Sequence, residues 1–357
     1  MRTPVVLVTG VDPDAMAATM VGLQFDLPHA VAVQHRIDPE RSELTRVVSD
    51  LSGVVEREVI DLAHACVTCA IREDVLPTLE RLAADGRWST VLAHLPVGAE
   101  AAQVCHVLAL DTVLARRLRV SAVLAAVEGP GVEDDLLGDD LLAERGRHSS
   151  EDDRRGLGEV AAAMVEHADL VVTHGTASPA ATELLAALAR PGVEVVEGTE
   201  HLEPTALVAD LHRHDRTQAW VAPVRAAELP LTRFEHEWRL DLVSPMPFHP
   251  HRLLDDIERL GTGRHRSRGC FWLPTRPDRV CTWDGAGGQL SIGNTEPWGR
   301  RTPLTRIVLT GLGRPPFELA DAFRSMLLSH DEAVADDRWQ TTYDGLEPWL
   351  GPIPDAA

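Results

Sequence analysis

Short runs of β-branched residues alternate with helical segments along the first 200 residues. Six runs have the composition of strands: residues 5–8, 30–33, 90–93, 120–127, 170–172 and 193–196. Between them, residues 75–84 and 182–189 have the apolar spacing of helices that bury one face. Strands separated by helices pair in parallel, because each helical crossover returns the chain to the same end of the sheet. Residues 1–200 are therefore predicted to form an α/β domain, with a mostly parallel sheet and helices on both faces.

The second part of the chain has a different pattern. Residues 201–235 are weakly patterned and are predicted to be a linker. Strand and helix patterns then return together, which predicts a smaller α+β domain over 236–330, followed by a tail over 331–357. Strands are expected at 238–243, 269–272, 290–292 and 305–310, and helices at 251–260 and 317–328.

Apolar stretches in this chain are short. Residues 120–127 form one of the longest, far below the ~20 residues that cross a bilayer. A predicted strand begins at Val5, directly after the first four residues, so we expect no signal peptide. Five cysteines, an odd number without the spacing of a disulfide scaffold, fit a reducing compartment. We therefore expect a cytoplasmic protein that does not enter a membrane.

All 34 basic side chains are arginine, so the chain contains no lysine. This excludes Schiff-base chemistry, a lysine general base and a lysine that binds phosphate. Against 55 Asp and Glu, the arginines leave a net charge of −21, which repels nucleic acid and argues against sequence-specific DNA binding. Residues 259–279 are the exception, with six arginines and one aspartate. There, Arg266 and Arg268 are predicted either to form structural ion pairs or to contact an anion, such as a partner's RNA backbone.

A glycine follows the first predicted strand, as in a phosphate-binding loop. Such a loop reads G-x-x-x-x-G-K-[ST]: its glycines admit the phosphates, its lysine binds them and its hydroxyl holds Mg²⁺. Gly10 is present here, but Met16 stands at the lysine position and Ala17 at the hydroxyl position. Asp12 and Asp14 add carboxylates, each of which repels a phosphate charge ~5 Å away by about 3 kcal/mol at an effective dielectric near 20. The loop therefore argues against binding of GTP and Mg²⁺.

Several longer segments carry a family resemblance. In the second part of the chain these are residues 248–254, 266–273 and 287–291, and in the first part residues 66–74. Together they resemble the CobW family of P-loop GTPases, a group linked to metal handling. The resemblance covers most of the chain. It implies a P-loop-GTPase-like first domain and a CobW-type C-terminal domain.

The nucleotide motifs depart from that family. His94 stands at the position of the acid that helps to hold Mg²⁺, and residues 174–177, His-Gly-Thr-Ala, stand where the base-reading Asn-Lys-x-Asp is expected. Ala177 cannot accept a hydrogen bond from guanine. The resemblance thus implies degenerate nucleotide motifs. We assign no catalytic residue and expect no enzyme activity; if the chain has one, the activity would be GTP hydrolysis.

Actinobacterial proteins with these features are associated with zinc limitation and with recruitment of a ribosome hibernation factor. The resemblance therefore implies a zinc-responsive recruitment protein without conventional GTP hydrolysis. Its partner would be a ribosome hibernation factor or the small ribosomal subunit. The alternative is an NTP-dependent zinc metallochaperone, a GTPase with an altered P-loop.

Two thiols, Cys66 and Cys69, stand three positions apart in a stretch similar to the family's Cys-x-Cys-Cys metal motif. Such a pair can chelate one Zn²⁺, although Zn²⁺ normally takes at least three protein ligands. His64 is the nearest candidate for a third ligand in the sequence, with His35 and His94 as alternatives in space. A pair of reduced thiols without metal, or a redox pair, stays open as an interpretation. Zinc at Cys66 and Cys69 is the cofactor that we expect.

The other sulfur and imidazole groups carry weaker signals. Cys105 follows a helical Ala/Val pattern and is predicted to lie in the core. His212 and His214 fall in the predicted linker and are predicted to be solvated.

Overall fold

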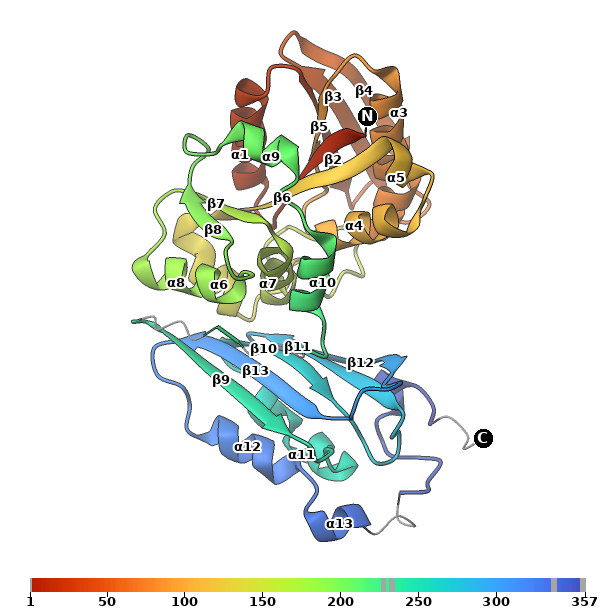
Figure 1. The fold of residues 1–357 in the computed structure, drawn as a ribbon, viewed down its shortest axis with the longest axis vertical. Helices are drawn as coiled ribbons and strands as arrows, with labels where there is room; N and C mark the ends of the chain where they lie inside the picture. Colours follow the sequence, from red (N-terminus) through yellow and green to blue (C-terminus); the bar gives the residue numbers. More distant parts are fainter. Residues whose placement is uncertain (1, 226–228, 231–234, 335–338, 354–357) are drawn as a thin grey trace. The chain divides into compact units, whose positions relative to one another are not determined.

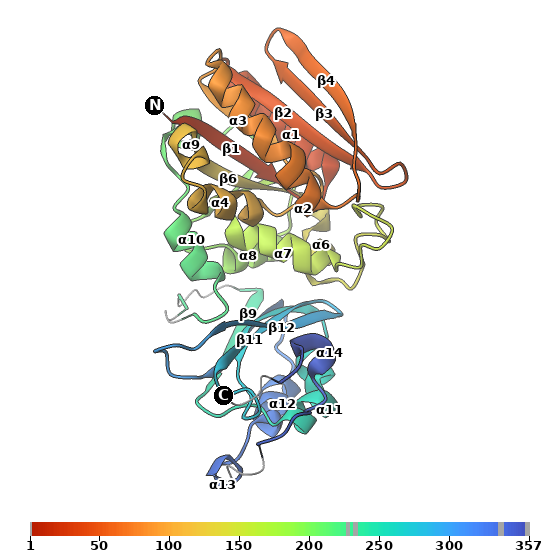
Figure 2. The same ribbon diagram turned by 90° about the vertical axis from the view of Figure 1, so that its right-hand side faces the viewer.

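The computed structural model describes residues 2–225, 229–230, 235–334 and 339–353. The chain divides into two compact units (Figures 1 and 2). The first comprises Met1–Asp135 and Asp140–Val221, and the second comprises Leu136–Asp139 and Ala222–Ala357. Each unit has its own sheet and its own hydrophobic core.

The first unit is built on an eight-stranded sheet with the order β4-β3-β2-β5-β1-β6-β7-β8. Six of these strands, from β2 to β8 in that order, pair in parallel, and β3 and β4 extend the sheet in antiparallel fashion. This confirms the predicted mostly parallel sheet. The strands are β1 (Thr3–Thr9), β2 (Ala30–Asp38), β3 (Glu43–Asp50), β4 (Gly53–Asp61), β5 (Thr90–His94), β6 (Leu118–Glu128), β7 (Leu170–His174) and β8 (Glu194–Glu197).

Helices cover both faces of this sheet, as predicted. Side chains alternate along β1: Val5 and Leu7 pack into a core with α3 and α4, whereas Val6 and Val8 pack into a second core with α1 and α9. The helices of the unit are α1 (Pro13–Asp26), α2 (Val67–Ala70), the π-helix η1 (Ile71–Val75), α3 (Leu76–Asp85), α4 (Ala101–Leu110), α5 (Leu114–Arg117), the 3₁₀ turn η2 (Gly129–Gly131), α6 (Val132–Leu137), α7 (Leu157–His167), α8 (Pro179–Leu188), α9 (Pro204–Ala209) and α10 (His214–Val221).

The second unit is an antiparallel sheet with the order β12-β11-β10-β13-β9, with α11 and α12 packed together on one face (Figure 1). Its core is aromatic: Trp283 is completely buried, and its Nε1 donates to Ser267 Oγ at 2.9 Å. The predicted α+β domain is confirmed. Its elements are β9 (Glu237–Ser244), α11 (Pro250–Gly261), β10 (His265–Phe271), β11 (Arg279–Ala286), β12 (Gln289–Pro297), β13 (Thr305–Leu312), α12 (Glu318–Met326), α13 (His330–Val334) and α14 (Glu347–Leu350).

The unit boundaries differ from the predicted linker and tail. Residues 204–221 are not a linker, because they form α9 and α10 within the first unit, where Leu207 is buried in the core. The tail also contributes to the core of the second unit, through Leu346 and Leu350. Residues 226–228 and 231–234 of the predicted linker, and 335–338 and 354–357 of the predicted tail, lie outside the described residues.

Candidate functional site

The connection from β1 to α1 is three residues long. It consists of Gly10, Val11 and Asp12, and α1 begins at Pro13. Asp12 caps the helix: its Oδ1 accepts hydrogen bonds from the backbone N–H groups of Asp14 at 3.0 Å and of Ala15 at 2.8 Å. The N-terminus of a helix binds anions through these same groups. At the N-terminus of α1, two of these amides are therefore already satisfied by the chain's own carboxylate.

An arginine from a distant loop neutralises this carboxylate. Arg147 Nη2 lies 2.7 Å from Asp12 Oδ2, and its Nη1 lies 3.3 Å from Asp135 Oδ2. The side chains of Asp12 and Arg147 are only 13% and 15% exposed. Burial raises the pKa of Asp135, against the lowering effect of Arg147. The three side chains form a partly buried cluster of charges beside the N-terminus of α1.

Met16, which the sequence analysis aligned with the lysine of a phosphate-binding loop, lies in the core. Met16 has no exposed surface and packs with Val8 and Leu23 in the core beneath α1. Gly10 is in close contact with it, since a Cβ on Gly10 would lie 2.8 Å from Met16 Cγ and 2.6 Å from the carbonyl oxygen of Ala126. Gly10 therefore serves close packing in this structure.

A cavity of about 740 Å³ lies at the C-terminal ends of β2 and β5. Open parallel sheets bind ligands at this end of their strands. Ala17, at the position of the missing hydroxyl, contributes to the wall. The charged and imidazole side chains that line the cavity are Asp14, His35, Arg36, Asp38, Glu40, His94, Arg147 and His148.

His94 ends β5 and faces this cavity as a neutral ring. Burial lowers its pKa to about 4, and its Nδ1 donates to the carbonyl oxygen of Leu95 at 2.8 Å. A carboxylate at this position would attract Mg²⁺, whereas a neutral imidazole does not supply the charged oxygen ligand that Mg²⁺ prefers. His35 lies nearby on β2, and its Nε2 lies 2.9 Å from Asp74 Oδ1. Asp74 in turn pairs with Arg46, and these contacts lower its pKa despite its burial.

The thiols of Cys66 and Cys69 lie at the start of α2. Cys66 caps this helix, with its Sγ accepting from Cys69 N at 3.1 Å, and both side chains are half-buried. The hydrogen bond with Cys66 raises the pKa of Cys69. His64 is exposed. Among the described residues, none of His64, His35 and His94 has a ring nitrogen within 4.8 Å of both thiol sulfurs in a set of three mutually close ligand atoms. Within the part of the chain that the structure describes, the two thiols therefore lie together without a third histidine, cysteine or carboxylate ligand.

The loop at the base-reading position is tied to α1. His174 ends β7, and its Nε2 lies 2.8 Å from the hydroxyl oxygen of the buried Thr19. Burial lowers the pKa of His174. Gly175, Thr176 and Ala177 follow it in the chain. Residues 174–177 therefore contain no carboxylate that could bind a guanine base.

The sequence left two roles open for Arg266, a structural ion pair or contact with an anion, and the structure shows an ion pair. Its side chain is almost completely buried, pairs with Asp284 of β11 and donates from Nη1 to the carbonyl oxygen of Gly285 at 3.2 Å. Arg268 lies opposite Asp284 in the register of β10 and β11. Arg276, from the same arginine-rich stretch, is completely buried against Asp344. Much of the positive charge of residues 259–279 is therefore compensated within the fold.

The structure also gathers a set of side chains that the sequence analysis kept apart. Cys105 lies in the core, as predicted, but His212 is buried rather than solvated and lies beside Cys105 and His167. Burial lowers the pKa of His167 to about 4 and raises the pKa of the Cys105 thiol. The one signal of this site in the sequence is the pair of histidines in His212-Arg213-His214. The polar residues around them led to the prediction of a solvated linker.

Among the described residues, no helix is long and apolar enough to cross a membrane. The chain combines an α/β unit, built on a mostly parallel sheet, with an antiparallel α+β unit, and this defines its class. The CobW C-terminal domain of cobalamin synthesis proteins matches residues 239–327, within the second unit. The second unit therefore contains a CobW C-terminal domain, which confirms the resemblance for this part of the chain.

Relatives align over much or all of the chain. A Mycobacterium tuberculosis protein named zinc chaperone Rv0106 is 29% identical over 403 aligned residues, covering 100% of this chain and 97% of that protein. The zinc-regulated GTPase metalloprotein activator 1 of Dictyostelium discoideum is 19% identical over 258 residues, covering 67% of this chain and 54% of that protein. The crystal structure of the zinc-bound YjiA GTPase from E. coli is 16% identical, covers 91% of this chain and 99% of that one, and has a TM-score of 0.38.

Proposed function

We propose that this protein is a zinc-responsive interaction protein that does not carry out conventional GTP hydrolysis. The observation that supports this most directly is the cap of α1, where Asp12 binds two backbone amides and Arg147. A phosphate could reach those amides only by displacing the Asp12 carboxylate. Each charged hydrogen bond lost in that exchange contributes about 1.5–3 kcal/mol.

Two further features oppose nucleotide binding at this loop. Asp14 stays in the first turn of α1 as a second negative charge, and it lines the cavity beside the loop. Met16, at the position of the phosphate-binding lysine, is buried in the core. No lysine elsewhere can take over that role, because the chain has none. The loop, the position of the Mg²⁺ acid and the base-reading position have all lost the side chains that a GTPase uses.

Calorimetric titration with GTP and with ATP, each in the presence of Mg²⁺, tests this part of the proposal. We expect no binding in the micromolar range and no nucleotide turnover above buffer. Micromolar binding, or turnover that depends on the protein, would refute the proposal of a non-hydrolysing protein.

Zinc is the proposed input, and Cys66 and Cys69 are its proposed ligands. The support is the pair of half-buried thiols at the start of α2, together with relatives named a zinc chaperone and a zinc-regulated GTPase activator. Two thiolates bind Zn²⁺ as soft ligands, and exogenous groups can complete the tetrahedron. A pair of protein ligands suits a site that gains and releases metal more than a permanent structural one.

Competition with a chromogenic zinc chelator tests these ligands. We expect Cys66→Ser/Cys69→Ser to lose one equivalent of zinc relative to the unaltered protein. Cys270→Ser is a matched control, because Cys270 is a buried thiol of the second unit, and we expect it to retain zinc. Equal competition by the unaltered protein and the double variant would remove these thiols from the proposal.

The proposed output is binding to a ribosome hibernation factor or to the small ribosomal subunit. Its support is the family resemblance, together with a net charge of −21 that favours a protein partner over a bare nucleic-acid backbone. The edge strand β4 also exposes the apolar side chains of Val54, Val55 and Val59. Pull-downs from zinc-starved and zinc-replete cells should differ in ribosomal components or a hibernation factor, and identical pull-downs would count against a zinc-dependent partner.

A second candidate function is that of an NTP-dependent zinc metallochaperone with an altered loop. The 740 Å³ cavity favours it, because Arg36 and Arg147 line the cavity and could contact phosphates without a lysine. In this case the calorimetric titration would show nucleotide binding, and Arg36→Ala would weaken it. Binding that is unchanged in Arg36→Ala would place any nucleotide elsewhere.

A further inference from the structure

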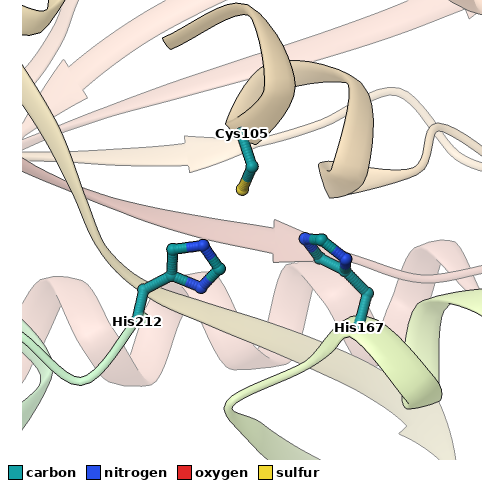
Figure 3. Close-up of side chains that lie close together, drawn as sticks. All are labelled: Cys105, His167 and His212. Carbon is teal, nitrogen blue, oxygen red and sulfur yellow. The ribbon is translucent and has the colours of Figure 1, made fainter. Parts of the chain in front are cut away.

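Three buried side chains from separate segments converge inside the first unit (Figure 3). Cys105 lies on α4, His167 is the last residue of α7, and His212 lies between α9 and α10. The Cys105 Sγ and one ring nitrogen of each histidine lie within 4.8 Å of one another. None of the three residues is more than 6% exposed. We propose that they form a second metal site, distinct from Cys66 and Cys69, for a borderline-soft divalent cation such as Zn²⁺.

His212 is oriented as a metal ligand by a buried carboxylate. Its Nδ1 lies 2.9 Å from Asp169 Oδ2, and Asp169 is held in place by Arg190 at 2.6 Å and by the backbone N–H of Val123 at 2.9 Å. Because a carboxylate accepts, Nδ1 carries the hydrogen and Nε2 carries the lone pair. Histidines that bind metals are commonly fixed in this way through their other nitrogen. The free lone pair of His212 Nε2 has no hydrogen-bond partner among the described residues.

His167 strengthens the argument, because both of its ring nitrogens are buried without a hydrogen-bond partner among the described residues. A buried polar atom without a partner lowers stability, so native structures rarely leave one without a reason. Figure 3 shows its ring and that of His212 turned toward the thiol of Cys105. A cation among the three would use one lone pair of each imidazole and would bind the sulfur as a thiolate.

The donor set selects the class of metal. One sulfur and two imidazole nitrogens suit Zn²⁺ and Co²⁺ and do not suit Mg²⁺ or Ca²⁺, which prefer oxygen. With Zn–S near 2.3 Å and Zn–N near 2.0–2.1 Å, tetrahedral geometry sets ligand atoms roughly 3.4 Å apart. The three atoms need to approach by little more than about an ångström, which rotation of a side chain about χ1 or χ2 provides. A fourth position is left for water or for a further ligand.

A metal here would fasten the segment before α10 to the body of the first unit. The backbone N–H of His212 already donates to the carbonyl oxygen of Ser121 on β6 at 2.8 Å, and α10 packs on α7. The metal would add links from this segment to α4 and α7. The proposed site is therefore structural and holds its ion more permanently than the two half-buried thiols of α2.

Cobalt binding to the full chain in the Cys66→Ser/Cys69→Ser background tests this proposal separately from the first zinc site. We expect one equivalent of Co²⁺ with a thiolate-to-cobalt charge-transfer band and the visible absorption of tetrahedral cobalt. Adding Cys105→Ser should abolish the charge-transfer band, whereas adding the matched control Cys270→Ser should preserve it. Asp169→Asn should weaken binding 10- to 100-fold, because it removes the acceptor that orients His212.

Two outcomes would overturn the proposal. One is the absence of a charge-transfer band in the Cys66→Ser/Cys69→Ser protein, which would show three packed side chains without a metal. The other is a band that persists in Cys105→Ser. If Cys105→Ser does not fold, His167→Gln in the same background provides the test, and an unchanged cobalt affinity and visible spectrum would refute the site. Failure of the zinc claim at Cys66 and Cys69 would leave all of these results unchanged.

Discussion

Met16→Lys returns the lysine of a phosphate-binding loop to its sequence position. In this structure the substitution would put an ammonium group into the core rather than beside a phosphate. Met16 is completely buried between Val8, Leu23 and the backbone of Gly10. We therefore expect Met16→Lys to destabilise the first unit strongly and to gain no affinity for GTP.

The magnitude follows from two costs. Losing the packing of a buried methionine costs about 2–5 kcal/mol by analogy with substitutions to alanine, although the aliphatic part of lysine recovers some of it. Burying the amine favours its neutral form and lowers its pKa, at about 1.4 kcal/mol for each unit. A positive charge in the first turn of α1 adds about 0.3–1 kcal/mol. We expect a loss of roughly 3 kcal/mol or more, a large part of the 5–15 kcal/mol that is typical of a domain.

Ala18→Lys is the matched control, because Ala18 is exposed on the same helix and the charge change is identical. Denaturant unfolding followed by circular dichroism should show a loss within about 0.5 kcal/mol for the control. The chain has no lysine, so the introduced amine is the single side-chain amine in each variant. An amine-reactive ester should therefore modify Ala18→Lys quickly and folded Met16→Lys slowly. Equal stability and equal labelling of the two variants, or micromolar GTP binding by Met16→Lys, would refute this account of the loop.

Substitutions at Asp12, His94 and Asp344 test three other parts of the structure. Asp12→Ala should cost about 1 kcal/mol more than Asp12→Asn, because asparagine retains the cap, and hydrogen exchange in the first turn of α1 should quicken only in the alanine variant. His94 has a pKa near 4 in the folded state and about 6.5 when unfolded, so its stabilising contribution is complete above pH 6.5 and declines as the pH falls toward 4. The titration of His94 should therefore lower the free energy of unfolding by about 2 kcal/mol between pH 7 and pH 5, and His94→Asn should remove this contribution while leaving that of His167. Asp344→Asn removes the nearest carboxylate partner of the buried Arg276, leaving Glu347 at 3.9 Å, and should cost about 3–5 kcal/mol in denaturant unfolding. Arg259→Ala breaks a more exposed pair and should cost less than about 1 kcal/mol. Similar losses in these last two variants would show that the tail does not hold the buried arginine.

Sequence patterns marked most clearly the buried strands at the centre of the first sheet. All residues of β1 after Thr3 are buried, as are residues 121–126 of β6, so a run of mostly apolar residues marks each strand. The hairpin of β3 and β4 carries no such mark, because β4 is an edge strand with most of its side chains exposed. In the second unit β11 was missed for a related reason, since its sequence includes Arg279, Thr282 and Asp284 among its apolar residues.

The departure of residues 10–17 from a phosphate-binding motif is visible in the sequence, because such a motif is local; that the loop binds no nucleotide stays a prediction. What fills the loop could not be predicted, since Arg147 is 135 residues away from Asp12. The burial of His212 depends in the same way on Asp169, 43 residues earlier, and on Cys105. A polar segment looks like a linker until its tertiary partners are known, and this is why His212 was placed in solvent.

The proposed lack of nucleotide binding at the N-terminus of α1 bears on how a signal could arise in this chain. In a nucleotide switch, the phosphate supplies the negative charge at the N-terminus of the helix, so the state of the protein depends on the ligand. Here Asp12 supplies that charge permanently, and Arg147 balances it. A ligand shifts a conformational equilibrium only through different affinities for the two states. A carboxylate of the chain itself is always present, so its concentration cannot vary.

Zinc at the half-buried thiols of Cys66 and Cys69 would be a ligand of variable concentration. The adjoining π-helix η1 is the kind of irregular helix that often adjusts at functional sites. Since η1 carries Asp74, which binds His35 and Arg46, a shift of α2 on metal binding would reach the wall of the cavity through that carboxylate.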